Sequence, residues 1–173
     1  MAISPEKLDS GLVCFYLFNI VHLKEGEGIF QDAGIPHAYL RGQNVELMAC
    51  SDNVIRGGLT PKYVDIAELL KIVDCREVTP QIISAAPQNQ SEFTYKTPVN
   101  DFALAQIRVE PEMHTKVNLQ SAGILLVMQG ELKIQEKSTA LTLKQGESAF
   151  ITADSNVEIM SEKGGYAFLA KLP

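Results

Sequence analysis

Apolar and polar residues follow a strand-like pattern along most of the chain. Gly11–Leu23, GLVCFYLFNIVHL, is apolar on both faces and rich in aromatic and β-branched residues, which predicts a strand enclosed in a core. Ile29–Gln31 and Asn44–Ala49 are shorter candidate strands. Seven further short strands, separated by turn signals, are expected at Phe102–Val109, Gly123–Met128, Glu131–Gln135, Ala140–Leu143, Ser148–Thr152, Asn156–Ser161 and Tyr166–Leu172. Together they predict a mainly β sandwich or barrel.

One segment has helical periodicity. Four apolar residues of Lys62–Val73 share one face of a helix, Thr60 can cap its N-terminus, and Pro61 fits its first turn. Thr79–Gln90 then loses periodicity and contains proline, serine and asparagine, so we expect a connection there.

The chain contains an internal repeat. Residues 23–37 align without gaps with residues 143–157, with six identities in fifteen positions. The glycine at the fourth position of each copy predicts a tight turn that starts a strand. The repeat therefore indicates a duplicated β-unit. The first copy ends with His37 where the second ends with Val157, so only the first can carry metal chemistry.

Composition narrows the class of protein. The 173 residues, 46% hydrophobic and 21% charged, are typical of a soluble globular protein. A net charge of −6 argues against nucleic acid or an anionic membrane as the main partner. Three cysteines without CxxC spacing indicate reduced thiols, more often buried than catalytic. The apolar run Leu12–Leu23 is too short for a membrane span, and its flank does not suit a signal peptide, so a cytoplasmic location is expected.

Polar side chains concentrate in Ala33–Lys62, where glycines and prolines forbid one long helix or strand. His37 and Tyr39 are two residues apart and would point the same way in an extended strand. A lone histidine is nevertheless more often structural or on the surface than a ligand. On the same reasoning, we expect His22 to be a hydrogen-bonded core histidine and His114 to be solvated.

The charged residues of this stretch allow two interpretations. Arg56 precedes two glycines and either stabilises its loop through Asp52 or binds a ligand. Glu46 and Asp52 are either acid/base groups or orient the cations, and Lys62 either contacts a phosphate or is simply exposed.

Two segments resemble the signature region of the type I mannose-6-phosphate isomerases, members of the cupin superfamily. They are Gly26–Gly42, GEGIFQDAGIPHAYLRG, and Val45–Lys62, VELMACSDNVIRGGLTPK. Later stretches, LLVMQGELKI and LKQGESAF, resemble that family's C-terminal cupin-like domain. The resemblance implies cupin-like jelly-roll units with one helix near 62–73. It also implies that residues 1–86 form the C-terminal part of the catalytic domain and that residues 87–173 form a cupin-like domain without metal ligands.

The family's activity is the zinc-dependent isomerisation of mannose 6-phosphate and fructose 6-phosphate. The resemblance implies that His37 matches one of four zinc ligands, the others lying upstream in the family, so stable zinc binding by this chain alone is not expected. It places Arg56 at the substrate phosphate or at a developing enediolate. Glu46 and Asp52 fall on catalytic positions, and Tyr39 and Lys62 on substrate-binding positions.

A second function class stays open, a non-catalytic cupin-like module that binds a sugar or a partner. Zinc content and conversion of mannose 6-phosphate would separate the two. Because a truncated barrel exposes strand edges, we also expect self-association through Gly11–Leu23, or pairing with a missing N-terminal half.

Overall fold

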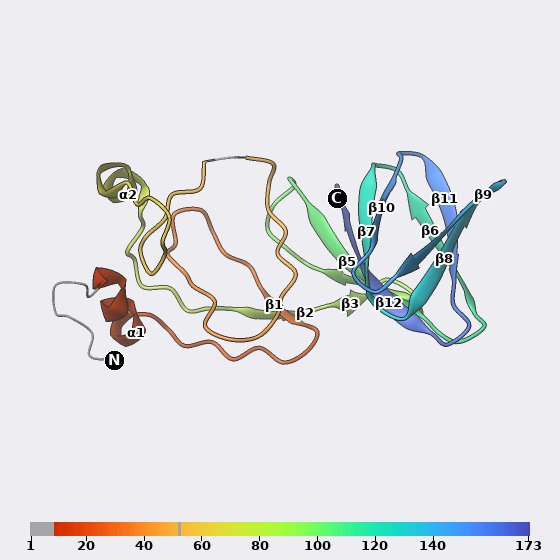
Figure 1. The fold of residues 1–173 in the computed structure, drawn as a ribbon, viewed down its shortest axis with the longest axis horizontal. Coiled ribbons are helices and arrows are strands. Elements are labelled where there is room, and N and C mark those ends of the chain that lie inside the picture. Colours follow the sequence, from red (N-terminus) through yellow and green to blue (C-terminus); the bar gives the residue numbers. More distant parts are fainter. Residues whose placement is uncertain (1–8, 52) are drawn as a thin grey trace. The chain divides into compact units, whose positions relative to one another are not determined.

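The computed structural model describes residues 9–51 and 53–173 and confirms a mainly β chain (Figure 1). It forms two compact units. The first comprises residues up to Glu25, Ile29–Val45 and Cys50–Ile82, and the second comprises Gly26–Gly28, Glu46–Ala49 and Ile83–Pro173.

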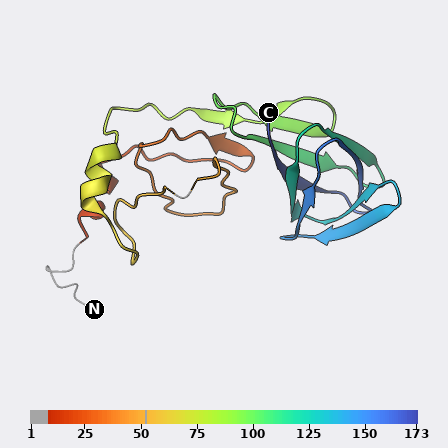
Figure 2. The same ribbon diagram turned by 90° about the horizontal axis from the view of Figure 1, so that it is seen from above.

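The second unit contains two antiparallel sheets (Figures 1 and 2). The six-stranded sheet has the order β10-β7-β12-β5-β4-β3, and the four-stranded sheet has the order β6-β11-β8-β9. The strands of the larger sheet are β3 (Ala86–Pro87), β4 (Glu92–Tyr95), β5 (Ala103–Val109), β7 (Gly123–Gln129), β10 (Ser148–Ile151) and β12 (Gly165–Lys171). Those of the smaller sheet are β6 (His114–Leu119), β8 (Glu131–Glu136), β9 (Thr139–Lys144) and β11 (Ser155–Met160).

The core lies between these two sheets. Burial alternates with period two, as in β6, where Thr115, Val117 and Leu119 are buried and the residues between them are exposed. Both sheets contribute to one apolar cluster, so the unit is a β-sandwich. Its buried members are Ala105, Ile107, Val109, Val117, Leu119, Leu125, Val127, Leu132, Ile134, Leu143, Ile151, Val157, Ile159, Ala167 and Leu169.

The first unit has little regular structure. A 3-10 turn, Ser10–Val13, leads into the short helix α1 (Cys14–Leu17), and a second helix, α2, covers Ile66–Ile72. Two short strands, β1 (Glu27–Ile29) and β2 (Ile82–Ser84), pair in a two-stranded sheet that belongs to neither sheet of the sandwich, and most of their residues belong to the second unit. Within residues 9–51 and 53–173, no helix is long and apolar enough to cross a membrane.

The predicted strand over Gly11–Leu23 is wrong. The segment begins as helical turns and continues without regular structure, and its large apolar side chains are exposed, with Tyr16 90% and Leu17 75% accessible. A strand needs a neighbour for its backbone hydrogen bonds, and this segment pairs with none of the described strands. Self-association through Gly11–Leu23 stays a prediction, although the exposed strand edge on which it was based is not present in this segment.

Other sequence predictions had mixed outcomes. All seven strands predicted between residues 102 and 172 are confirmed to within about two residues. The helix is confirmed but begins at Ile66, because the side chain of Asp65, not that of Thr60, caps it by accepting a hydrogen bond from the Glu68 N–H at 3.0 Å. The strand predicted at Asn44–Ala49 is absent from the structure, whereas the expected connection Thr79–Gln90 contains β2 and β3. Strands β4 and β6 were not predicted.

Candidate functional site

The loop that carries His37 begins with a glycine whose backbone conformation and close backbone contact both disfavour a side chain. Gly34 has φ +79°, and a Cβ there would lie 2.8 Å from the carbonyl oxygen of Ile72. The Gly34 carbonyl oxygen accepts a hydrogen bond of 2.9 Å from the Asp74 N–H. Close backbone contact therefore fixes this loop against the residues after α2.

Arg76 supports the same contact. Its guanidinium lies 3.2 Å from an Asp32 carboxylate oxygen and 3.4 Å from one of Asp74. All three side chains are substantially exposed, so the ion pairs contribute little free energy each. Together they connect the start of the His37 loop to the segment after α2.

His37 has its ring orientation fixed by the backbone. Its Nδ1 lies 3.0 Å from the carbonyl oxygen of Ile35. Because a carbonyl can only accept, this hydrogen bond requires a proton on Nδ1, which leaves the lone pair of the neutral ring on Nε2. Metal-binding histidines commonly have this arrangement, with one nitrogen bonded to the backbone and the other available.

Tyr39 lies beside His37, as the two-residue spacing predicted. Their ring centroids are 6.0 Å apart with planes at 65°, an edge-on contact. Both residues are exposed. The structure thus brings together one predicted ligand and one predicted substrate-binding residue.

The loop after Arg56 is held by a residue that we did not single out from the sequence. One carboxylate oxygen of Asp9 accepts a hydrogen bond from the Leu59 N–H and the other from the Gly11 N–H, each at 2.8 Å. Gly58 and Leu59 have positive φ, +147° and +52°. Asp9 precedes Ser10 and Gly11, a sequence typical of a capping position, and that was the available signal.

The remaining predicted residues come from segments further along the chain. Arg56 and Lys62 are exposed in the first unit, and Glu46 is exposed in the second. Among the described residues, no hydrogen bond or ion pair joins these three side chains to His37. Asp52 lies outside the described residues, so the suggested pair with Arg56 is untested.

The described residues do not fit a zinc ion on their own. Within residues 9–51 and 53–173, no three histidine, cysteine, aspartate or glutamate side chains form a group that could hold a metal. Zinc needs three or four protein ligands, and His37 supplies one nitrogen.

The other histidines and the cysteines can be compared with their predicted burial. His22 is exposed and outside any strand, so its predicted place in the core is wrong. His114 is exposed as predicted, with Nδ1 3.2 Å from a Glu158 carboxylate oxygen. Cys14 is half-buried, whereas Cys50 and Cys75 are exposed, against the expectation of burial.

The two repeat copies share their turn but differ at their last residue. Gly26 and Gly146 have φ of +81° and +84°, and each precedes a strand, as predicted. Val157, the counterpart of His37, is buried within β11, whereas His37 is exposed and lies in no strand. The metal-capable side chain thus lies exposed in a loop, and its counterpart belongs to the core.

Comparison with known proteins identifies the second unit by family. Residues 91–163 match the family model described as the mannose-6-phosphate isomerase cupin domain. Mannose-6-phosphate isomerase from Escherichia coli K12 is 43% identical over 150 residues, which cover 86% of this chain and 38% of that protein.

Solved structures agree with the sequence matches. A mutant of phosphomannose isomerase from Salmonella typhimurium superposes with a TM-score of 0.70 at 30% identity, covering 95% of this chain and 43% of that one. The Salmonella enzyme bound to fructose 6-phosphate and zinc has a TM-score of 0.58 at 35% identity, covering 72% of this chain and 32% of that one. The chain is therefore similar over most of its length to mannose-6-phosphate isomerases, and it spans 38% of the length of its Escherichia coli relative.

Proposed function

We propose that this chain supplies one part of the active site of a zinc-dependent mannose-6-phosphate isomerase. The observation that carries the proposal is a spacing. Mutants of the Salmonella enzyme replace a histidine, a glutamate nine positions later and an arginine ten positions after that. His37, Glu46 and Arg56 have the same separations in this chain.

His37 is the metal ligand of the proposal. Its Nδ1 bond to the Ile35 carbonyl presents the Nε2 lone pair, and its place in a backbone-anchored loop keeps the ring oriented. The other ligands come from residues outside this sequence, because the described residues do not complete a zinc site. The family's zinc thus depends on the rest of the enzyme.

The other predicted residues act on the sugar phosphate. The guanidinium of Arg56 offsets negative charge, on the phosphate or on the enediolate that forms when a proton leaves C2 or C1. Glu46 or Asp52 moves that proton between the two carbons. Tyr39 and Lys62 bind the substrate, Tyr39 from beside His37. In this assignment residues 1–86 are the catalytic part and residues 87–173 the cupin-like domain without metal ligands.

A second candidate is a non-catalytic module that binds a sugar or another protein. One observation favours it: residues 91–163, which match the cupin-domain model, contain none of the predicted site residues. The sandwich is complete as a packed unit without them.

A chimera tests the first candidate. The stretch of the Escherichia coli isomerase that aligns with this chain is replaced by this chain, and zinc content and turnover of mannose 6-phosphate are measured. We expect an active chimera with one zinc. His37→Ala should remove zinc and activity, and Arg56→Lys should lower kcat with zinc retained, because lysine lacks the planar fork.

His114→Ala is the matched control, since His114 lies in the sandwich and should change neither zinc content nor turnover. A folded His37→Ala chimera with full zinc and activity would refute the assignment. A folded chimera without activity, together with binding of mannose 6-phosphate by the isolated chain, would favour the module.

A further inference from the structure

One guanidinium on the sandwich is held in a fixed orientation. Nε and Nη2 of Arg108 donate hydrogen bonds of 3.1 and 3.0 Å to the side-chain oxygen of Gln106. The central carbon of the guanidinium lies 4.1 Å from the centroid of the Phe93 ring, a cation–π contact. A solvated arginine side chain samples several rotamers, whereas these two contacts restrain the guanidinium of Arg108 on two sides.

The restraint is rooted in the sheet. Gln106 and Arg108 are two apart on β5 and point to the face opposite the core residue Ile107. Gln106 is 8% exposed, and it pairs in register with Phe93 of β4. The buried amide and the aromatic ring therefore form a platform that belongs to the sandwich, with the guanidinium on top.

Arg108 keeps its charge and part of its bonding capacity. A guanidinium has five N–H donors, and the bonds to Gln106 use only its Nε and Nη2 side. Among the described residues, no ion pair joins Arg108 to a carboxylate, since Glu92 on the neighbouring strand pairs with Lys171 at 2.8 Å. The outward side of the guanidinium can therefore bind a ligand.

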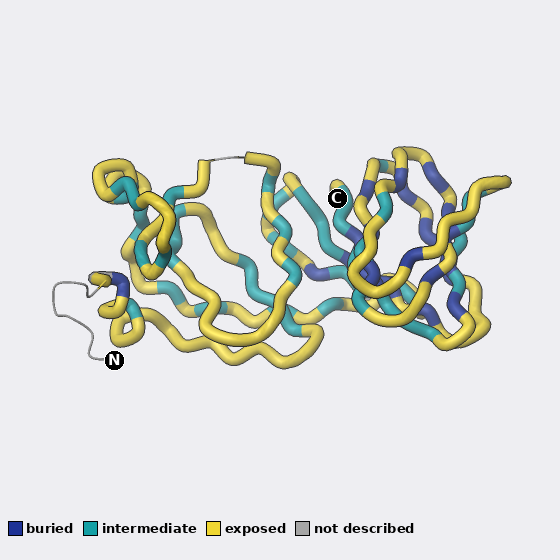
Figure 3. The backbone as a smooth tube through the Cα atoms, in the orientation of Figure 1, coloured by how far each residue is buried: buried dark blue, intermediate teal, exposed yellow. Residues whose placement is uncertain are grey.

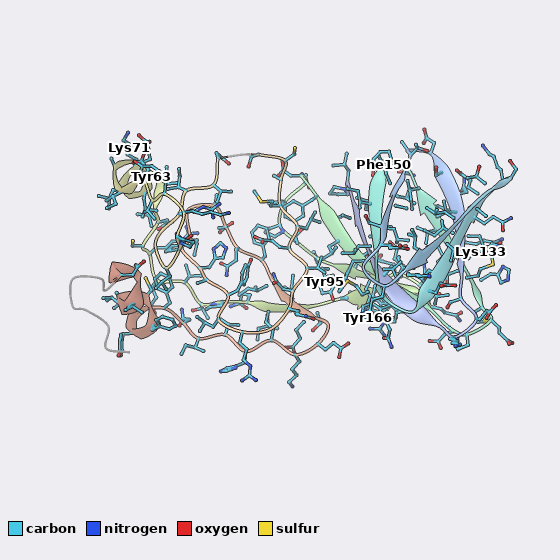
Figure 4. The ribbon with its side chains drawn as sticks, viewed as in Figure 1. Tyr63, Lys71, Tyr95, Lys133, Phe150 and Tyr166 are labelled. Atoms are coloured by element: carbon cyan, nitrogen blue, oxygen red, sulfur yellow. The ribbon has the colours of Figure 1, made fainter. Side chains whose placement is uncertain are left out.

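A hollow of about 270 Å³ adjoins the arginine. Its polar lining consists of Gln106, Arg108, Glu110, Gln129, Lys163 and Tyr166. Tyr166 on β12 lies opposite Arg108 in the β5–β12 register, and Figure 4 labels it on the sandwich. Gly164 and Gly165 form part of the wall, and a side chain at Gly165 would collide with the Gln129 carbonyl oxygen, 2.3 Å from its Cβ position. Two cations face one carboxylate, so the hollow is net positive.

We propose that this hollow binds a small oxyanion, a phosphate monoester or a carboxylate, with Arg108 as its principal ligand. The planar fork of a guanidinium matches two oxygens of either group. Lys163 adds a point charge, and the Gln129 amide and Tyr166 hydroxyl can bond the rest of the ligand. The volume is at the small end for ligand pockets, which selects a small molecule. The hollow shares no lining residue with Ala33–Lys62.

The test is a titration of the ¹⁵N-labelled 173-residue chain with inorganic phosphate and, separately, with acetate, followed by amide and Arg Nε–H chemical shifts. We expect saturable shifts at Arg108, Lys163, Gly165 and Tyr166. Saturation by phosphate but not acetate identifies a phosphate ligand, and the reverse identifies a carboxylate. Absence of saturable shifts at Arg108 with both anions overturns the proposal.

Two variants separate charge from structure. Arg108→Lys keeps the charge but loses the fork, and should weaken binding at least about tenfold. Gln106→Glu keeps an acceptor oxygen in the same place and should leave the sandwich folded, while its carboxylate neutralises Arg108 and abolishes binding. Lys133→Met, an exposed lysine of β8 on the other sheet, is the control and should bind like the parent chain.

The outcomes are distinct from those of the isomerase test, which measures zinc and turnover. Equal binding by the parent chain and by folded Gln106→Glu overturns the proposal. Equal loss in Lys133→Met also does so, because it shows attraction by surface charge in general.

Discussion

The two units differ in how they use apolar residues. The sandwich buries fifteen apolar side chains between its sheets, and five of them are wholly inaccessible isoleucines or leucines: Ile107, Leu125, Leu132, Ile159 and Leu169. In the first unit, by contrast, Tyr16, Leu17 and Ile20 are 90%, 75% and 64% exposed. Figure 3 shows the same difference, with buried backbone concentrated along the strands of the sandwich. Similar apolar content therefore gives a core only where paired strands hold it together.

The two copies of the repeat show a similar difference in burial between two short segments. Gly26 and Gly146 have nearly the same φ, so the repeated turn sequence adopts the same backbone conformation in both copies. After Gly146, β10 pairs with β7 over four residues and Ile151 is 5% exposed, whereas β1 has three residues, all half-exposed. A turn thus sets the chain direction, but burial depends on the strands that are present beside it.

The largest effect should come from removing core volume in the sandwich. Ile107→Ala deletes a fully buried side chain and should lower the free energy of unfolding by about 2–5 kcal/mol. The measurement is urea unfolding followed by circular dichroism. Ile124→Ala in the same sheet is the control, because Ile124 is 52% exposed and its loss should cost less than about 1 kcal/mol. Equal losses would show that the sandwich core does not dominate stability.

The next effect should come from the turn glycine of the sandwich. Gly146→Ala places a side chain at φ +84° with no atom within 4 Å, so the cost is backbone strain alone, about 1–2 kcal/mol. Gly57→Ala is the control, since it also meets no atom within 4 Å and lies outside the left-handed region. Urea midpoints of the two variants test this. A Gly146→Ala midpoint as high as that of Gly57→Ala would show that the turn carries no strain.

A smaller, local effect is expected in the first unit. Asp9→Ala removes the acceptor of the Gly11 and Leu59 N–H groups and should cost about 1 kcal/mol of local stability. Amide hydrogen exchange should become faster at Gly11 and Leu59 while the protection of β5 and β12 stays unchanged. Faster exchange throughout the sandwich would show that the contacts of Asp9 stabilise more than the loop that they hold.

The same contrast explains what could be predicted from sequence. The strands from Gly123 onward were predictable because each is short and lies between turn signals such as MQGEL, LKQGE and EKGGY. Gly11–Leu23 has strong strand propensity but no strand partner among the described residues, and propensity alone cannot supply one. At the α2 N-terminus, Thr60 was predicted to cap the helix, but the side chain of Asp65 caps it instead.

The candidate site was predictable only in its local part. The two-residue spacing placed Tyr39 beside His37 correctly. The Asp9 contact with Leu59 joins residues fifty positions apart, and the Phe93–Gln106–Arg108 platform depends on the β4–β5 register. Neither separation leaves a signal in a single sequence.

The smallest expected effect is a pH dependence inside the second unit. Burial raises the pKa of the Tyr95 phenol above its ordinary value, the charge of Arg108 lowers that pKa, and Tyr166 raises it further. The Tyr95 hydroxyl also donates a hydrogen bond of 2.9 Å to the Gly26 carbonyl, and only the protonated form can donate it. Because the folded-state pKa is the higher one, the unfolded chain loses this proton first as pH rises. The contribution of Tyr95 to stability is therefore fully present below about pH 10 and is lost as pH rises through the folded-state pKa.

Urea midpoints of the parent chain and of Tyr95→Phe, measured from pH 8 upward, should converge or cross as the parent loses this contribution. Midpoint curves that stay parallel to the highest pH at which the chain folds would show that the phenol is not held protonated by its surroundings.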